Sequence, residues 1–89
     1  MNSILIVGAG NMGGVLAKGL CSSTRNYSVD IYDLHFDKSQ EIEEMTKAKA
    51  FESLSGISKP HDVIILCVKP QDLHVVSEQL KKSTLVREQ

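Results

Sequence analysis

Three glycines in the segment Gly8-Ala9-Gly10-Asn11-Met12-Gly13 form a G-x-G-x-x-G pattern between an apolar run and a segment of helical periodicity. In such a turn the first glycine permits a tight bend, the second lets a pyrophosphate approach the backbone, and the third allows close packing of helix on strand. The free N–H groups that open the helix would then face the phosphates. The pattern predicts a dinucleotide-binding turn, and the alternative is a glycine turn used only for packing.

An acidic residue stands where such a turn needs one. Asp33 ends the alternating run 29–33 and lies twenty positions beyond Gly13. A carboxylate there can accept hydrogen bonds from the adenosine ribose hydroxyls, which favours NAD and repels a 2′-phosphate. Its alternative roles are a solvated turn residue or a cap of the next helix. His35 and Lys38 follow closely and offer positive charge to a phosphate, so NAD is favoured slightly and NADP stays open.

A second candidate segment, Lys69-Pro70-Gln71, follows the apolar run 63–68. An uninterrupted apolar run bounded by turn signals predicts a strand buried on both faces, as in parallel sheets. Ligands collect at the carboxyl ends of strands in open α/β sheets, so these three residues are candidates for a binding site. A helix that simply begins there with an exposed lysine fits the pattern equally well.

The other reactive side chains suggest no catalytic group. His61 and His74 have no acid or nucleophile partner visible in the sequence, and we expect them on the surface. Cys21 and Cys67 form no CxxC or Cys/His cluster and lie in apolar surroundings, which favours buried structural thiols. We therefore predict neither a catalytic constellation nor a metal site in this chain.

The elements that must position these groups alternate between strand and helix. Strands are predicted at 4–7, 29–33, 50–51 and 63–68, with the start of a further strand at 84–86. Helices are predicted from the glycine turn to about Ser22, from near Asp37 to near Lys49, and from Pro70 onward. This order predicts an α/β fold, a Rossmann-like open parallel sheet with helices on both faces.

Apolar spacing also predicts which helix residues face the sheet. The expected apolar positions are Met12, Val15, Leu16, Gly19 and Leu20 in the first helix, Ile42 and Met45 in the second, and Leu73, Val76 and Leu80 in the third. Asp37 followed by Gln40 resembles a capping box at the start of the second helix.

Composition limits the class of protein. The chain has 89 residues, 10 Lys and Arg against 11 Asp and Glu, a formal charge of −1 and a hydrophobic fraction of 42%. One domain is the most that this length holds, and the charge balance gives no reason to expect a nucleic acid partner. The longest apolar run, 63–68, is far shorter than the roughly 18–20 residues that cross a bilayer, so we expect no membrane association and a cytoplasmic protein.

Two blocks carry a family resemblance. Residues 4–20 read ILIVGAGNMGGVLAKGL, and residues 62–71 read DVIILCVKPQ. Together they resemble the amino-terminal part of the cofactor domain of pyrroline-5-carboxylate reductase, from Ile4 to about Val86. The GAGNMG turn is shared with neighbouring families, whereas VKPQ at the end of a strand is more specific. The resemblance implies an oxidoreductase that reduces 1-pyrroline-5-carboxylate to L-proline with NAD(P)H, the last step of proline biosynthesis.

The resemblance also implies a set of cofactor-binding residues. Those around the phosphates would be Val7, Gly8, Ala9, Gly10, Asn11, Met12 and Gly13, and those near the nicotinamide would be Cys67, Val68, Lys69 and Pro70. The segment 33–38 would meet the adenosine ribose or its phosphate. Members that use NADPH often carry Ser, Thr or Arg where Asp33 stands, so the expected cofactor remains NADP or NAD.

Family members continue into a helical domain that forms the dimer and supplies substrate contacts. Residues 1–89 are therefore expected to be the amino-terminal portion of an NAD(P)-binding domain, inactive alone, whose full-length form is a homo-oligomer that binds a small imine. One alternative is a non-catalytic nucleotide-binding module. Another is the cofactor domain of a related reductase or 2-hydroxyacid-type dehydrogenase, which the VKPQ segment argues against.

Overall fold

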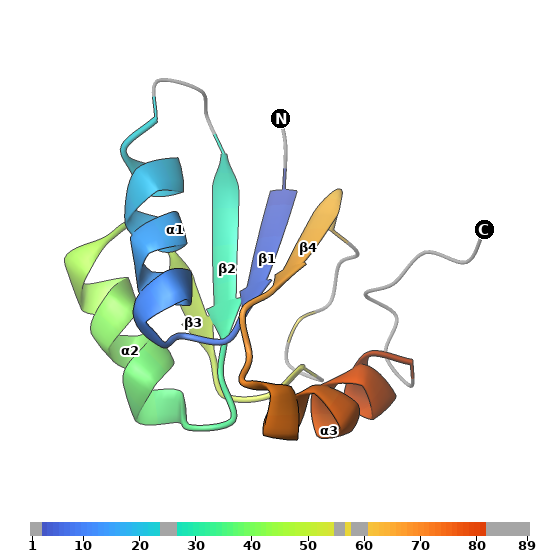
Figure 1. The fold of residues 1–89 in the computed structure, drawn as a ribbon. Helices are drawn as coiled ribbons and strands as arrows, with labels where there is room; N and C mark the ends of the chain where they lie inside the picture. Colours follow the sequence, from blue (N-terminus) through green and yellow to red (C-terminus); the bar gives the residue numbers. More distant parts are fainter. Residues whose placement is uncertain (1–2, 24–26, 55–56, 58–60, 82–89) are drawn as a thin grey trace.

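The computed structural model describes residues 3–23, 27–54, 57 and 61–81. The strands are β1 (Ser3–Val7), β2 (Ser28–Tyr32), β3 (Lys49–Phe51) and β4 (Val63–Leu66), and the helices are α1 (Asn11–Cys21), α2 (Phe36–Met45) and α3 (Pro70–Lys81). All strand pairs are parallel, and the sheet has the order β3-β2-β1-β4. The predicted Rossmann-like α/β class is confirmed (Figure 1).

Helices cover both faces of the sheet, α1 and α2 on one side and α3 on the other (Figure 1). Successive residues of a strand point to opposite faces, so β1 contributes to two cores. Buried residues of the first core are Ile4, Ile6, Ala9, Ala17, Val29, Ile31, Ile42 and Ala48. Buried residues of the second core are Leu5, Val7, Tyr32, Leu54, Ile57, Val76 and Leu80.

The predicted apolar stripe of α1 is partly wrong. Met12 and Val15 are 66% and 69% exposed, whereas Gly13, Gly14 and Ala17 are the buried residues of this helix. A Cβ on Gly14 would lie only 3.0 Å from Cδ1 of Ile42, which shows how closely α1 approaches α2. Small residues permit this approach, while Met12 and Val15 turn outward. Gly19 is exposed as well, whereas Leu16 and Leu20 pack against the first core as predicted.

The predicted start of α2 is also wrong in detail. The helix begins at Phe36 with His35 as N-cap, and no side chain caps it, so the expected capping box between Asp37 and Gln40 does not form. Ser39 instead donates its hydroxyl to the carbonyl of Phe36 at 2.9 Å.

The helix α2 ends at Met45, four residues before the expected end near Lys49. The Thr46 hydroxyl donates to the Ile42 carbonyl at 2.7 Å and accepts from the N–H of Ala48 at 3.0 Å. This side chain replaces the backbone bonds of another helical turn and directs the chain into β3. Met45, expected on the apolar face, is exposed.

Strand β4 is shorter and less buried than predicted. It spans Val63–Leu66, and the side chains of Val63 and Leu66 are 47% and 44% exposed. The reason is its place at the edge of the sheet, because among the described residues β4 pairs only with β1. Helix α3 begins at Pro70 as expected and buries Val76 and Leu80, while Leu73 is exposed.

The predicted strand at 84–86 lies outside the described residues. No helix in the described part of the chain is long and apolar enough to cross a membrane.

Candidate dinucleotide site

The glycine turn and the segment after β4 meet at Gly8. This residue has φ +114° and donates its N–H to the carbonyl of Tyr32 at 2.7 Å. A Cβ on Gly8 would lie 2.6 Å from the carbonyl carbon of Cys67 and 2.9 Å from the nitrogen of Val68. Both the positive φ and the close backbone of Cys67 and Val68 exclude a residue with a side chain at position 8. The two blocks singled out in the sequence are therefore neighbours in space.

The other two glycines of the pattern have different surroundings. A Cβ on Gly13 would overlap the carbonyl oxygen of Gly8 and lie 3.5 Å from Cγ2 of Ile6, so this glycine lets α1 pack on the turn and on β1. A Cβ on Gly10 would have no neighbouring atom within 4 Å. The backbone at Gly10 is thus the part of the turn that an external group can approach.

Helix α1 begins with unpaired donors. Its N-cap is Gly10, no side chain caps the helix, and its first turn contains no acidic residue. The N–H groups of Asn11, Met12 and Gly13 have no acceptor within an α-helix, and the helix dipole adds positive charge at this end. These donors suit an anion such as a phosphate.

Asp33 lies beside this turn and is half-buried. Its Oδ2 accepts the N–H of Ala9 at 2.6 Å, and its Oδ1 accepts the N–H of His35 at 2.8 Å. The carboxylate thus joins the glycine turn to the loop that precedes α2. The bond to Ala9 was not foreseen, since it depends on the parallel pairing of β1 with β2.

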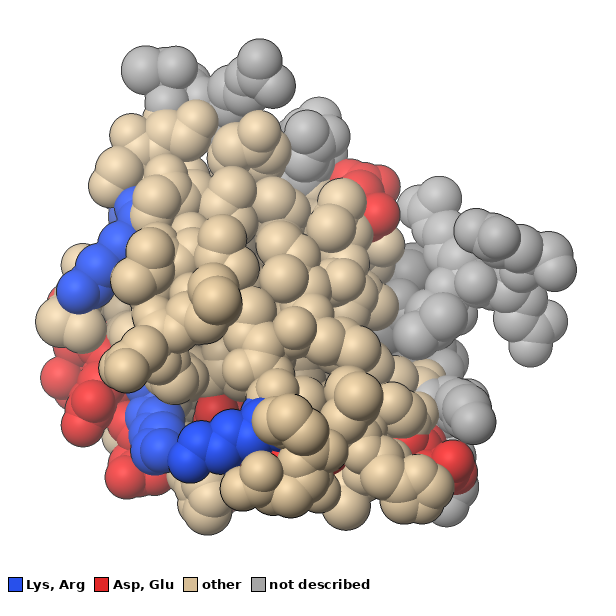
Figure 2. All heavy atoms as spheres, viewed as in Figure 1, with Lys and Arg blue, Asp and Glu red and all other residues tan. Residues whose placement is uncertain are grey.

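A cavity of about 250 Å³ opens at the carboxyl ends of the strands. It is lined by Gly10, Asp33, Leu34, His35, Lys38, Cys67, Val68, Lys69, Gln71 and Asp72. Lysine side chains lie over the space between α2 and α3, next to acidic surface (Figure 2). The volume is below the roughly 300–1,000 Å³ of sites that enclose a drug-sized ligand. The cavity is therefore too small to enclose a whole dinucleotide.

A second groove, of about 480 Å³, contains residues of α1 and α2 and shares Gly10 and Lys38 with the first cavity. Ala9 and Asn11 line it as well. Among the other predicted site residues, Val7, Gly8 and Gly13 are buried beneath the turn, whereas Met12 and Pro70 are exposed. The structure thus brings the predicted residues to one edge of the sheet, although only some of them line a cavity.

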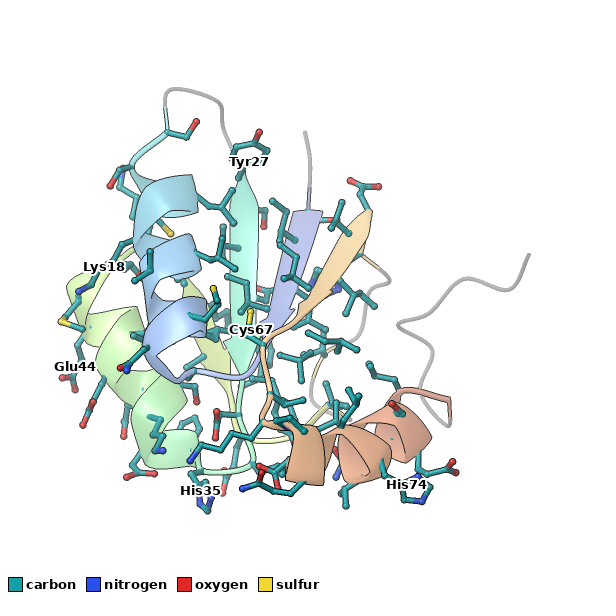
Figure 3. All side chains as sticks on the ribbon, viewed as in Figure 1. Lys18, Tyr27, His35, Glu44, Cys67 and His74 are labelled. Carbon is teal, nitrogen blue, oxygen red and sulfur yellow. The ribbon has the colours of Figure 1, made fainter. Side chains whose placement is uncertain are left out.

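Cys67 leaves the end of β4 and donates its N–H to the carbonyl of Val7 at 2.7 Å. The side chain lies between β4 and the start of α1 in Figure 3 and packs on the first core. Burial raises the pKa of the Cys67 thiol. Both cysteines are free and half-buried, so the prediction of buried structural thiols is corrected. The structural reason is that Cys67 follows an edge strand and Cys21 ends a helix.

The prediction for His61 is wrong. This side chain is buried, 6% exposed as a residue, and its Nε2 lies 2.7 Å from Oδ2 of Asp30 on β2. Its Nδ1 has no hydrogen-bond partner among the described residues. His61 precedes β4 and Asp30 is the middle residue of β2, and neither residue lines the cavity. His74 is exposed, as predicted (Figure 3).

Within the described ranges, no group of three or more His, Cys, Asp or Glu side chains is placed to hold a metal ion.

A comparison with protein families gives a match over residues 3–88 to the family described as NADP oxidoreductase, coenzyme F420-dependent. The chain belongs to this family. The family places the chain among cofactor-binding domains of NADP-dependent oxidoreductases, and the prediction of NADP or NAD as the cofactor is confirmed at this level. The finer assignment to pyrroline-5-carboxylate reductase goes beyond the family match.

Among solved structures, the chain is similar to a putative NADP oxidoreductase from Bacteroides fragilis, with a TM-score of 0.81 and 20% sequence identity. The match covers 98% of this chain and 33% of that one, so the chain spans about a third of the length of this relative. At this identity the likeness concerns the fold. A comparison with curated proteins gave no significant match.

Proposed function

We propose that this chain supplies the dinucleotide-binding part of an oxidoreductase that uses NADPH or NADH. The observation that carries the proposal is the glycine turn, where Gly8 closes against the backbone at Cys67 while Gly10 stays open above the uncapped start of α1. A turn used only for packing would require Gly8 and Gly13 but would not require an unobstructed Gly10. Family membership supports the same function.

In this proposal the phosphates lie at the N–H groups that open α1. The adenosine ribose lies toward the segment 33–38 and the nicotinamide side lies toward the segment 67–70, and residues of both segments line the same cavity. The proposed cofactor-binding residues are Val7, Gly8, Ala9, Gly10, Asn11, Met12, Gly13, Asp33, Cys67, Val68, Lys69 and Pro70. The bound cofactor would supply the hydride, while these residues bind and orient it.

The substrate we favour is a small cyclic imine, 1-pyrroline-5-carboxylate, because the VKPQ segment follows β4 and contributes Lys69 and Gln71 to the cavity. Residues 1–89 would then be the amino-terminal part of an NAD(P)-binding domain, and the full-length enzyme a homo-oligomer. The family description favours a second candidate, a reaction between NADP and coenzyme F420. A third candidate is a module that binds nucleotide without catalysis.

Calorimetric titration with NADPH and with NADH tests the binding function directly. Gly10→Val should lower the affinity about tenfold or more, because a side chain there enters the space where the pyrophosphate approaches the backbone. Gly19→Val is the matched control, since a Cβ at Gly19 also meets no atom within 4 Å but lies at the far end of α1. Equal affinity for the wild-type chain and Gly10→Val would contradict the proposed site.

Turnover assays separate the candidate reactions. Oxidation of NADPH in the presence of 1-pyrroline-5-carboxylate would support imine reduction, and oxidation in the presence of oxidised coenzyme F420 would support the second candidate. Binding without turnover in either assay would favour the nucleotide-binding module, or a reaction that needs residues outside this chain.

A further inference from the structure

Two consecutive N–H groups of the glycine turn are bound to two consecutive residues of the chain at the end of β2. Gly8 donates to the carbonyl of Tyr32 at 2.7 Å, and Ala9 donates to the carboxylate of Asp33 at 2.6 Å. The first bond continues the ladder of the sheet and needs no particular side chain. The second bond exists only because residue 33 carries a side-chain acceptor.

The Asp33 carboxylate has a second backbone partner, the N–H of His35 at 2.8 Å. Its two oxygens therefore accept hydrogen bonds from two different loops, which fixes the orientation of the side chain. Hydrogen bonds from backbone N–H groups to a carboxylate are stronger than those between neutral groups. The bond from Ala9 is part-buried and is protected in part from competing water, whereas the bond from His35 is exposed.

We propose that Asp33 is a positioning residue that holds the glycine turn in the conformation that binds phosphate. This inference rests on the proposed function, because it explains how the turn is prepared for a dinucleotide. It also divides the donors of the turn into two groups. The N–H groups of Gly8 and Ala9 are used within the protein, so the phosphates are bound by the N–H groups of residues 10–13.

This role differs from recognition of the ribose, which the sequence suggested. A residue that recognises the ribose discriminates between NADH and NADPH, so its loss changes the ratio of the two affinities. A residue that positions the turn serves the phosphates common to both cofactors, so its loss weakens both equally. The direction of the change in affinity is informative as well. Removal of a negative charge beside a phosphate site would by itself strengthen binding, so weaker binding indicates that the turn has lost its support.

The test compares Asp33→Asn and Asp33→Ala with the control Glu44→Gln. The control also removes one negative charge, from an exposed residue of α2 that lines neither the cavity nor the groove at Gly10. Titrations with NADPH and NADH should show about tenfold weaker binding of both cofactors to the Asp33 variants. A change of this size corresponds to the loss of one charge-assisted hydrogen bond, that from the Ala9 N–H to Asp33. The ratio of the two affinities should stay at the wild-type value, and the control should bind both cofactors at least as well as the wild-type chain.

Amide hydrogen exchange measured without ligand provides a second readout. In the Asp33 variants, exchange should accelerate at Ala9 and His35 but not at Ile6 or Ile31 in the strand cores, which separates local loosening from general unfolding. Unchanged exchange at Ala9 would overturn the inference, as would a changed affinity ratio without weaker binding of both cofactors. A wild-type chain that bound neither cofactor would instead refute the proposed function, and exchange at Ala9 would still show whether Asp33 holds the turn.

Discussion

Each end of β1 is hydrogen-bonded to the side chain of an aspartate from a neighbouring segment, but the two aspartates have different surroundings. At the amino end Asp62 accepts the N–H of Ser3 at 3.0 Å and the hydroxyl of Ser3 at 3.3 Å, in an exposed position. At the carboxyl end Asp33 accepts the N–H of Ala9 at 2.6 Å, in a half-buried position beside a cavity. The same kind of hydrogen bond thus serves strand pairing at one end and the candidate site at the other.

The residues around the two aspartates explain why the ends of β1 differ. Near the amino end, next to Asp62, the His61 side chain is buried and pairs with Asp30 of β2. At the carboxyl end, glycines replace side chains, so the backbones of the turn and of the segment after β4 approach each other closely. The amino end is closed by side chains, whereas the carboxyl end leaves room for a ligand.

The largest effect is expected when the glycine contact at the carboxyl end is broken. Gly8→Ala places a Cβ against the Cys67 backbone at a positive φ, and we expect a loss of about 2–4 kcal/mol in the free energy of unfolding. Urea denaturation followed by circular dichroism measures it. Gly19→Ala, in open space within α1, should instead stabilise the chain by up to about 1 kcal/mol. Equal stability of the two variants would refute the packing described for Gly8.

A smaller effect is expected from the buried pair at the amino end. His61→Ala removes a buried side chain and leaves Asp30 without its hydrogen-bond partner, which should cost about 1–3 kcal/mol of stability. The same denaturation experiment measures it, with the exposed His74→Ala as control, expected to change stability by less than about 0.5 kcal/mol. Cofactor affinity should be unchanged in the folded His61 variant, because this pair lies away from the cavity.

Asp62→Ala tests whether the aspartate at the amino end of β1 has a role in cofactor binding. Its hydrogen bonds to Ser3 are exposed, so their loss should reduce stability by about 1 kcal/mol or less. Calorimetric titration should give the wild-type affinity for NADPH and NADH, in contrast to Asp33→Ala. A tenfold loss of affinity in Asp62→Ala would mean that the two ends of β1 do not have separate roles.

The smallest effect concerns alkaline pH. Burial raises the pKa of Tyr32, and nearby Asp33 raises it further, against the opposing effect of the hydrogen bond to Gln79. The folded chain therefore holds the phenolic proton more tightly than the unfolded chain, so this stabilisation is complete below the ordinary tyrosine pKa and is lost as pH rises through the raised pKa. Urea midpoints measured across this alkaline range should fall more steeply for the wild-type chain than for Tyr32→Phe.

The order of strands and helices was predictable because each element carries its own pattern. The apolar run of β1, the glycine turn and the run of β4 identify a parallel α/β sheet without further information. The end of α2 was not predictable in this way, because it depends on the hydrogen bonds of a single hydroxyl, that of Thr46. The exposed face of α1 was also misjudged, since glycine and alanine contribute little to an apolar pattern although they pack most closely.

The other features that the sequence did not predict depend on partners far away along the chain. The burial of His61 depends on Asp30, a residue 31 positions away, and the bond of Asp33 to Ala9 spans 24 positions. No local spacing reveals such pairs. The location of the candidate site was nevertheless predictable, because parallel strands bring their carboxyl ends to one edge of the sheet.

The pairing of β1 with β4 has a consequence for how the protein folds. Ser3 and Asp62, which flank this pair, are separated by 59 residues, so the contact closes a long loop, whereas β2 and β3 are joined through α2 alone. Contacts of high sequence separation carry the larger entropic cost of loop closure and slow folding. During synthesis the Gly8 turn leaves the ribosome well before Cys67, the neighbour against which it packs. Competence to bind a dinucleotide should therefore be acquired only when β4 docks on β1, and the rate at which binding appears during refolding would measure that step.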